Sequence, residues 1–345
     1  MKIKGTNVRG TPTAVLVFVI GALIAAPPAP AASKGNRRNL LLVTLDTTRP
    51  DRLGCYGNAS VATPAIDGLA RSGALFERAF AHTPTTLPSH TSILLGLTPP
   101  AHGVHDNSGF VVPAGLATMA ERLKARGYAT GAFIGAFPLD SRFGLSRGFD
   151  VYDDNCGSQE PGLLEFVERR AEAVIERALA WLNDPARTEP WFLWVHLFDP
   201  HQPWRPPEPF GTRYAAAPYD GEVAYTDHAL AALLEALRAR DPEGRTLVVL
   251  TGDHGESLGE HGELTHGYFA YNATLHVPLI LSGAGIKPAR IAANVGHVDI
   301  FPTVCDLLGI EAPAGLQGGS LRALIEGKKA DSPPVYFESL NPYTS

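Results

Sequence analysis

The residues of this chain best suited to chemistry are Asp253 and His254, which follow the largely apolar run 247–252. A second apolar run, 40–45, ends directly in Asp46. In α/β proteins, ligands bind at the carboxyl ends of parallel strands. Two carboxylates and an imidazole delivered to one sheet edge are suitable ligands for a divalent metal ion. We therefore expect one metal site there; the alternative for the Asp253–His254 pair alone is a helix cap and a packed ring.

Thr86 is the candidate nucleophile. Pro88 suits the first turn of a helix and Gly96 suits its end, so Thr86 falls at or just before the helix N-terminus. There the helix dipole and the unpaired N–H groups favour an anion, either an alkoxide or a phosphate-like group. A plain N-cap is the alternative role for this residue.

The elements that must position these residues are predicted by alternating apolar runs and amphipathic stretches. This alternation predicts an α/β fold, with a mostly parallel central sheet flanked by helices on both faces. Strands are expected at 39–45, 128–135, 191–198, 246–251, 277–282 and 334–338. Helices are expected at 64–72, 116–126, 163–183, 222–240 and 298–308, besides the one near Thr86. The proline-rich and aromatic stretch 199–219 is expected to be an ordered active-site loop.

Composition narrows the compartment and the partners of this chain of 345 residues. Its net charge of −6 gives no reason to expect a nucleic-acid partner. Residues 1–31 combine a positive head, an apolar run and a small-x-small site at 29–31, which indicates a secretory signal peptide and export to the periplasm or beyond. A membrane association is expected only if that signal stays uncleaved, and the oligomeric state is not indicated.

Four ordered motifs resemble the sulfatase family, within the alkaline phosphatase superfamily. The segment 45–57 is similar to the family's opening metal-binding segment, and 251–262 is similar to its later metal segment almost residue for residue. Thr86-Leu-Pro-Ser-His90 aligns with the signature Cys or Ser, any residue, Pro, Ser or Ala, Arg, and 96–103 resembles the stretch that follows it. The resemblance implies an alkaline phosphatase-like catalytic domain over 37–345. A strand as late as 334–338 also suggests that a C-terminal subdomain is missing.

Departures from the family pattern favour phosphoryl over sulfuryl chemistry. Thr86 stands where a sulfatase carries the Cys or Ser that becomes formylglycine, and threonine cannot give that aldehyde because its Cβ carries a methyl group. His90 replaces the signature arginine, Thr47 replaces the second acidic residue of the opening pair, and Ala136 replaces an expected lysine. No formylglycine is therefore expected. A threonine nucleophile resembles instead the phosphoethanolamine and phosphoglycerol transferases and the nucleotide phosphodiesterases of the superfamily.

The resemblance also implies roles for individual residues. One divalent metal ion would be held by Asp46, Thr86, Asp253 and His254. This ligand set favours Zn²⁺ or Mn²⁺, with Ca²⁺ left open because sulfatases with an Asp-His segment use it.

Four further residues are assigned around the ester. His201 resembles the histidine that meets a substrate oxygen or the leaving group, and its reference pKa of about 6.5 would allow general-acid catalysis. An ordinary loop histidine is the alternative. His90 and Asn107 could donate to nonbridging oxygens. His266, in a His-Gly pair similar to one in the transferases, could touch the transferred group or help to hold a second metal.

Three functions follow from these residues. The first is an exported metal-dependent hydrolase that acts on small-molecule, glycan or lipid esters of sulfate or phosphate. The second is a transferase that passes a phospho-group from a lipid donor to an acceptor. The third is a non-catalytic relative that binds a metal ion and uses the cleft for recognition, although such a protein has no need of a positioned nucleophile.

Overall fold

The computed structural model describes residues 38–156, 169–329 and 334–340, together with the single positions 2 and 5. The chain divides into a unit over 1–36 and a compact unit over 37–345. The expected signal peptide at 1–31 lies outside the described residues, as does the first part of the helix expected at 163–183. Among the described residues, no helix has the length and apolar character needed to cross a membrane.

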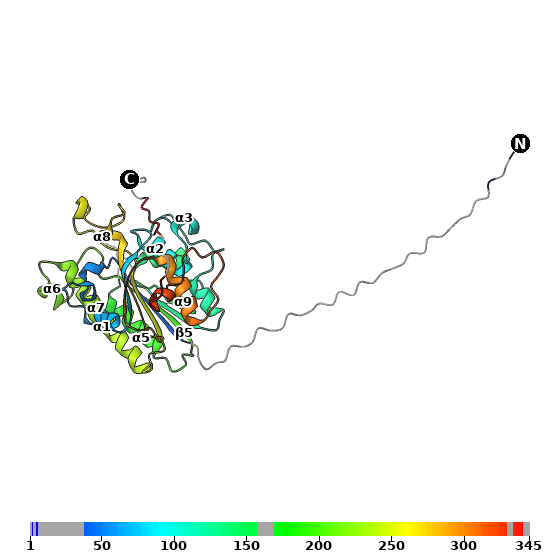
Figure 1. Ribbon diagram of the computed structural model, residues 1–345. Helices are drawn as coiled ribbons and strands as arrows, with labels where there is room; N and C mark the ends of the chain where they lie inside the picture. The colour runs from blue at the N-terminus through cyan, green and yellow to red at the C-terminus, as the bar shows by residue number, and fades with distance from the viewer. Residues whose placement is uncertain (1, 3–4, 6–37, 157–168, 330–333, 341–345) are drawn as a thin grey trace. The chain divides into compact units, whose positions relative to one another are not determined.

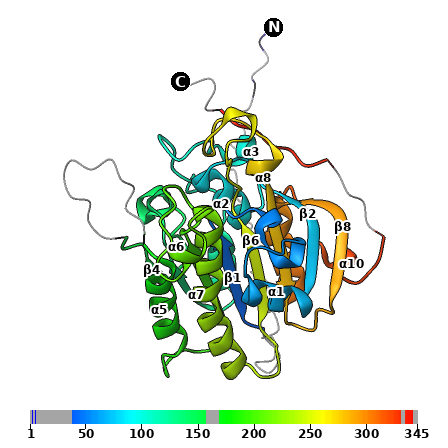
Figure 2. The same ribbon diagram turned by 90° about the vertical axis from the view of Figure 1, so that its left-hand side faces the viewer.

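One eight-stranded sheet runs through the larger unit, in the order β4-β3-β5-β1-β6-β7-β2-β8 (Figures 1 and 2). β1 is parallel to β5 and β6, whereas β7 is antiparallel to both β6 and β2. The predicted fold class, a mostly parallel sheet in an α/β protein, is thereby confirmed. The strands are β1 (Leu40–Leu45), β2 (Ala74–Phe80), β3 (Ala129–Phe133), β4 (Val151–Asp153), β5 (Trp191–Leu197), β6 (Leu247–Gly252), β7 (His276–Ser282) and β8 (Ala289–Gly296).

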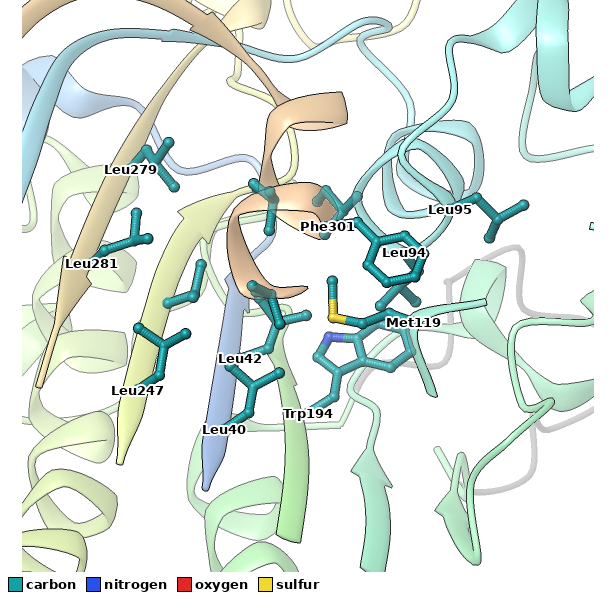
Figure 3. Packing of buried hydrophobic residues seen from close by; sticks show 14 of the residues in the cluster. Leu40, Leu42, Leu94, Leu95, Met119, Trp194, Leu247, Leu279, Leu281 and Phe301 are labelled. Carbon is teal, nitrogen blue, oxygen red and sulfur yellow. The ribbon is translucent and has the colours of Figure 1, made fainter. Parts of the chain in front are cut away.

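Helices cover both faces of this sheet, because its central strands are apolar on both sides. Leu41 and Val43 of β1 pack in a cluster with α1, α5 and α7, whereas Leu40 and Leu42 pack in a second cluster with α2, α4 and α9 (Figure 3). Every residue of β1, β5 and β6 is buried, as expected for strands covered on both faces. The helices are α1 (Pro64–Arg71), α2 (Thr86–Leu95), α3 (Pro99–His102), α4 (Met119–Lys124), α5 (Ala171–Leu182), α6 (Phe210–Arg213), α7 (Pro218–Arg240), α8 (Asn272–Leu275), α9 (Ile300–Leu308) and α10 (Arg322–Ile325).

Helix α2 lies inside the protein, and its N-terminus points to the carboxyl ends of β1 and β6. It begins at Thr86, and Thr85 is its N-cap. It ends at Gly96, whose φ of 66° is the left-handed conformation that glycine adopts without strain. All ten of its residues are buried. The expected position of Thr86 at the start of a helix is therefore the observed one.

Two groups of sequence predictions need correction. The strand expected at 334–338 is wrong: residues 334–340 run as a strap without a strand partner, and a backbone bond joins Glu338 N–H to the His82 carbonyl. Conversely, β2, β4 and β8 were not predicted. β2 carries the charged pair Glu77–Arg78 in its middle, β4 is only three residues long, and β8 alternates weakly at the sheet edge, so none of them forms the apolar run that marked the other strands.

Candidate active site

Asp46, Asp253 and His254 meet at the carboxyl ends of two neighbouring strands. Leu45 of β1 is paired with Gly252 of β6, so the next residue of each strand reaches the same point. One potential ligand atom from each of the three residues lies within 4.8 Å of the others, and all three residues are buried. The Asp46 N–H donates to the Leu197 carbonyl and the Asp253 N–H to the Leu45 carbonyl, so the hydrogen bonds between these parallel strands continue to both aspartates. The register of the parallel strands thus brings together groups that are 207 positions apart in the chain.

Three of the four carboxylate oxygens of Asp46 and Asp253 converge with no hydrogen-bond donor among the described residues. Asp253 Oδ1 accepts from the Thr47 and His254 backbone N–H groups at 3.1 and 2.7 Å. Asp253 Oδ2 and both carboxylate oxygens of Asp46 are buried and have no hydrogen-bond donor among the described residues. His254 Nδ1–H donates to the Gly255 carbonyl at 3.0 Å, which leaves Nε2 as a lone pair 3.5 Å from Asp253 Oδ2. A divalent cation fits this donor set, because buried carboxylates need a compensating charge.

The pKa values of the two carboxyl groups reflect the same shortage of positive charge. Burial raises the pKa of Asp46 to about 8, although the nearby His266 opposes the shift. Burial and the neighbouring Asp46 raise the pKa of Asp253 well above its ordinary value. Both carboxylates would be stabilised in their charged form by a cation bound between them.

Thr47 adopts a strained backbone conformation beside this site. Its φ of 48° lies in the left-handed region, which is unusual for a β-branched residue. The turn directs its N–H to Asp253 Oδ1, and the Tyr219 hydroxyl donates to its carbonyl at 2.7 Å. Such strain persists where the surrounding contacts hold it, and here those contacts orient a candidate metal ligand.

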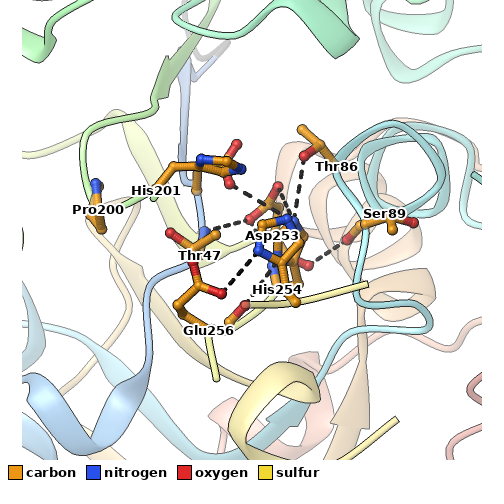
Figure 4. A network of polar contacts seen from close by, with 12 residues as sticks. Thr47, Thr86, Ser89, Pro200, His201, Asp253, His254 and Glu256 are labelled. Carbon is orange, nitrogen blue, oxygen red and sulfur yellow. Dashed lines mark hydrogen bonds and ion pairs between the residues drawn. The ribbon is translucent and has the colours of Figure 1, made fainter. Parts of the chain in front are cut away.

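Thr86 lies beside the three candidate ligands. Its Oγ1 is 3.4 Å from His254 Nε2, and Figure 4 shows Thr86 and His201 on either side of the Asp253–His254 pair. Because Thr86 is the first residue of α2, its hydroxyl sits at the positive end of the helix dipole. Ser89, one turn further on, donates to the Asp253 carbonyl and so fastens α2 to the end of β6.

A cavity of about 360 Å³ opens onto Thr86. The predicted residues Asn107, His201 and His266 line it together with Thr86. The Leu87 backbone N–H donates to Asn107 Oδ1 at 2.7 Å, which leaves the side-chain NH₂ group to serve as the donor. The structure therefore brings these four predicted residues to one cavity.

The two cavity histidines have opposite charge preferences. Burial, and then the adjacent His266, lower the pKa of His201 to about 3, so this ring is neutral near pH 7. Its Nδ1–H donates to the Gln202 carbonyl at 2.5 Å, and its ring stacks on Phe198. Burial opposes a charge on His266 as well, but Glu256, whose Oε1 accepts from His266 Nδ1 at 3.0 Å, raises the pKa of His266 above its ordinary value.

His90 does not occupy the position expected for it. It is completely buried behind Thr86, with Nδ1 bonded to the Thr86 carbonyl at 2.8 Å and Nε2 to Thr44 Oγ1 at 3.0 Å. Burial, and then the neighbouring His196, keep the pKa of His90 well below its ordinary value. The expected donation from His90 to ester oxygens is therefore wrong, because both ring nitrogens are engaged inside the protein. His90 is placed to position Thr86.

Two residues near the candidate metal ligands were not predicted. His196 Nε2 lies 3.3 Å from Asp46 Oδ2, and its Nδ1 contacts Thr44 Oγ1 at 3.1 Å. Its position as the one ionisable residue inside the apolar run 191–198 was the signal that could have revealed it. Glu256, the partner of His266, comes two residues after His254 and is fully buried. A carboxylate in such a buried position rarely serves the fold alone.

The structure thus places Thr86 and three buried candidate metal ligands together at one edge of an α/β sheet, an arrangement that fits an ester hydrolase. The family can be stated plainly: this chain belongs to the sulfatase family, because the model of the Sulfatase family matches residues 38–310. The sulfatase YidJ of Escherichia coli (strain K12) is 26% identical, over 84% of this chain and 71% of that protein. The ulvan-active sulfatase of Formosa agariphila is also 26% identical, over 84% of this chain and 65% of its own length.

Solved structures share the fold. The phosphonate monoester hydrolase of Agrobacterium radiobacter superposes with a TM-score of 0.72 at 23% identity, over 86% of this chain and 78% of the other. BT1596, a 2-O glycosaminoglycan sulfatase, superposes with a TM-score of 0.71 at 22% identity, over 88% of this chain and 79% of the other. The alkaline phosphatase-like fold expected from the motifs is thereby confirmed.

Proposed function

We propose that this protein is an exported, metal-dependent hydrolase of phosphate or sulfate esters with Thr86 as its nucleophile, and that phosphoryl transfer is its preferred reaction. The observation that carries this proposal is the position of Thr86 Oγ1, at the N-terminus of α2 and 3.4 Å from His254 Nε2. A threonine that served only as an N-cap would have no reason to face three buried candidate ligands.

The metal ion would be held by Asp46, Asp253, His254 and the Thr86 oxygen. Two carboxylates, one imidazole and one hydroxyl oxygen suit Zn²⁺ or Mn²⁺ better than Ca²⁺, which takes six to eight oxygen ligands. When bound, such a cation supplies Lewis-acid stabilisation and a lower pKa for the neighbouring hydroxyl. The Thr47 backbone N–H supports this ligand set, because it holds Asp253 in place, and His196 lies 3.3 Å from Asp46.

The reaction that the side chains support has two displacements. Thr86 gives its proton to solvent, its Oγ1 forms a bond to phosphorus or sulfur as the bond to the ester oxygen breaks, and the departing oxygen takes up a proton from solvent to leave as the alcohol. Water then attacks the covalent adduct, which restores the Thr86 hydroxyl and releases the acidic product. Asn107 NH₂ and His266, whose charge Glu256 supports, are placed to donate to nonbridging oxygens. His201 is neutral near pH 7, so it is suited to accept a hydrogen bond from the attacking water and orient it rather than to serve as the resting acid.

Substitution of Thr86 tests this assignment. Thr86→Ala removes the nucleophile, so we expect kcat/KM for a chromogenic phosphodiester to fall by at least about 10³-fold. Thr86→Ser keeps a hydroxyl at the same place and should retain most of the activity. Mass spectrometry of the peptide that carries residue 86, after an acid quench during turnover, should show the adduct in the wild-type protein.

Metal content is the control: both variants should bind as much metal as the wild-type protein, because Asp46, Asp253 and His254 remain. Undiminished turnover by Thr86→Ala in a metal-loaded preparation would contradict the assignment.

Product formation that requires an added alcohol acceptor would favour a transferase of the phosphoethanolamine or phosphoglycerol type. Metal binding without turnover of any ester would favour a recognition protein. Export through residues 1–31 is tested by fractionation of cells that express the full chain.

A further inference from the structure

A second cavity, of about 400 Å³, lies at the end of the sheet opposite to Thr86. Part of its wall is Arg38, which precedes β1, whereas Asp46 follows that strand. Another part is the turn 284–287, which follows β7, a strand antiparallel to β6. The length of β1 thus separates the two sites by on the order of 20 Å. The volume is within the range of sites that bind small molecules.

One side of this second cavity is apolar. Ile286, Leu307 and Ile325 line it, from the turn after β7, from α9 and from α10. Leu307 and Ile325 belong to the apolar cluster that contains α9, and Ile286 packs against that cluster. A hydrocarbon group placed here would therefore lie against a surface that is continuous with the core, which favours its burial.

The other side carries two basic residues, Arg38 and Lys287. Arg38 Nη1 donates to the Leu307 carbonyl at 2.8 Å, and this bond holds the guanidinium at the cavity wall. Lys287 is exposed at the turn after β7. In the part of the chain that the structure describes, neither base has an acidic side chain within ion-pair distance. Both charges are therefore available to a ligand.

The acidic residues near this cavity are already balanced by other bases. Glu326, which also lines the cavity, pairs with Arg322 at 2.8 Å and with Lys328 at 2.5 Å. Asp306 pairs with Arg322 at 3.1 Å. Two acids thus offset two bases among the described residues, and the two bases of the preceding paragraph remain uncompensated. The cavity is a positive region of a chain whose net charge is −6.

From this combination of an apolar wall and two uncompensated bases, we propose that the cavity is a binding site for a small amphipathic anion. Its carboxylate, sulfonate or phosphate head would be bound by Arg38 and Lys287, because such oxyanions accept charge-assisted hydrogen bonds from these groups. Its hydrocarbon part would pack against Leu307 and Ile325. The site is separate from the cavity at Thr86, and the inference does not depend on the reaction proposed there.

Titration calorimetry on the full chain with octane-1-sulfonate tests this site, because a sulfonate is not an ester and cannot be hydrolysed. We expect one molecule to bind per protein. Octylammonium has the same tail and the opposite charge, so it should bind at least tenfold more weakly. Hexane-1-sulfonate lacks two buried methylene groups and should bind about tenfold more weakly than the octyl compound.

Substitutions at the two bases locate the bound anion. Lys287→Gln removes one charge at an exposed position, and Arg38→Gln removes the other while the amide can still donate to the Leu307 carbonyl. Each should weaken the binding of octane-1-sulfonate by at least about fivefold. Lys329→Gln is the matched control, because Lys329 is an exposed lysine that does not line the cavity. Its affinity should stay within about twofold of the wild-type value.

Three results would contradict the inference. Equal affinity for octane-1-sulfonate and octylammonium would show that the bases do not select the ligand. Unchanged binding in both Lys287→Gln and Arg38→Gln would place the anion on another surface, and equal losses in Lys287→Gln and Lys329→Gln would indicate only a general effect of net charge. Sedimentation with phosphatidylglycerol vesicles tests a lipid surface: vesicle binding that depends on Lys287, without binding of the free sulfonate, would also overturn a small-molecule site.

Thr86→Ala separates this inference from the proposed function. That variant should bind octane-1-sulfonate as tightly as the wild-type protein does, even if neither protein hydrolyses any ester. A loss of binding in Thr86→Ala would place the probe in the cavity at Thr86 and would refute the second site.

Discussion

Glu256 and His266 form a close acid–base pair beside the candidate metal ligands. Their atoms lie 3.0 Å apart, and the Glu256 carboxylate has no solvent exposure. Burial alone would hold His266 neutral, but the Glu256 charge reverses this preference and raises the pKa of the imidazole. Among the carboxylates that raise the pKa of His266, Glu256 has the largest effect, ahead of Asp46 and Asp253.

Removal of that carboxylate charge should change the pH–rate profile. In Glu256→Gln, the largest influence that raises the pKa of His266 is gone and only the weaker ones of Asp46 and Asp253 oppose burial, so the pKa falls and the imidazolium is lost at lower pH. We expect the high-pH limb of kcat/KM for a singly charged ester to move down by about one pH unit or more. The profile measured from pH 5 to 9 gives the shift directly.

Glu260→Gln is the matched control, because Glu260 belongs to the same loop but pairs with Arg49 instead of His266. Its pH–rate profile should keep the wild-type limb. A limb that stays in place in Glu256→Gln would show that the protonation of His266 does not limit the reaction.

At the scale of elements, three segments position the site: β1, β6 and the interior helix α2. A fourth contribution comes from the strap 334–340. Glu338 accepts from His105 Nδ1, two residues before Asn107, and Ser339 Oγ donates to the carbonyl of Gly267, next to His266. The strap thus connects the two loops that supply Asn107 and His266 to the cavity.

Loosening the strap should reduce activity more than stability. Glu338→Gln weakens a charge-assisted bond to His105, and small displacements of binding groups are costly in catalysis, so we expect kcat/KM to fall by about tenfold. The thermal midpoint should change little, because the strap is largely exposed and lies outside both apolar clusters. Steady-state kinetics and a melting curve on the same preparation test both points.

Glu326→Gln, at the C-cap of α10, serves as the control, because Glu326 is a glutamate in ion pairs with Arg322 and Lys328 and does not line the cavity in front of Thr86. Its activity should equal that of the wild type. If Glu338→Gln melts much earlier and loses activity only in proportion to the unfolded fraction, the strap stabilises the fold and does not position the loops.

At the scale of the whole molecule, the buried pair of carboxylates would connect the proposed metal binding to folding. The pKa of Asp46 is raised to about 8 in the metal-free protein, against an ordinary value of 3.8. A raised pKa means that the folded state holds its proton more tightly than the unfolded chain. Its contribution to stability is therefore complete below about pH 4 and is lost as the pH rises towards 8.

Chelated protein should accordingly become less stable as the pH rises from 5 to 8, by at most about 1.4 kcal/mol per pH unit for each such proton. Metal binding removes this loss, because the cation replaces the proton, so the gain in melting temperature from Zn²⁺ or Mn²⁺ should be larger at pH 8 than at pH 5. Melting curves with and without chelator at both pH values measure the difference. In chelated Asp46→Asn the loss should be smaller, and an unchanged pH dependence there would assign it to other groups.

Several parts of this protein could be predicted from local sequence alone. Asp46, Asp253 and His254 each follow an apolar run, and parallel strands deliver their next residues to one edge. Pro88 lies in the first turn of a helix that begins at Thr86, and Gly96 is its C-cap. These features depend on strand alternation, helix termini and the direction of parallel strands, which act over a few residues and so are visible in the order of residue types.

Only the tertiary structure decided which histidines face the cavity and which lie in the interior. His90 turns into the interior because Thr44, on β1, offers its hydroxyl there, while His196 reaches Asp46 because β5 and β1 pair with Thr44 opposite His196. The strap at 334–340 likewise looked like a strand until its partners, His82, His105 and Gly267, were seen to belong to loops. These outcomes depend on which distant segments become neighbours, and that is a property of strand order and register, which periodicity within one segment does not encode.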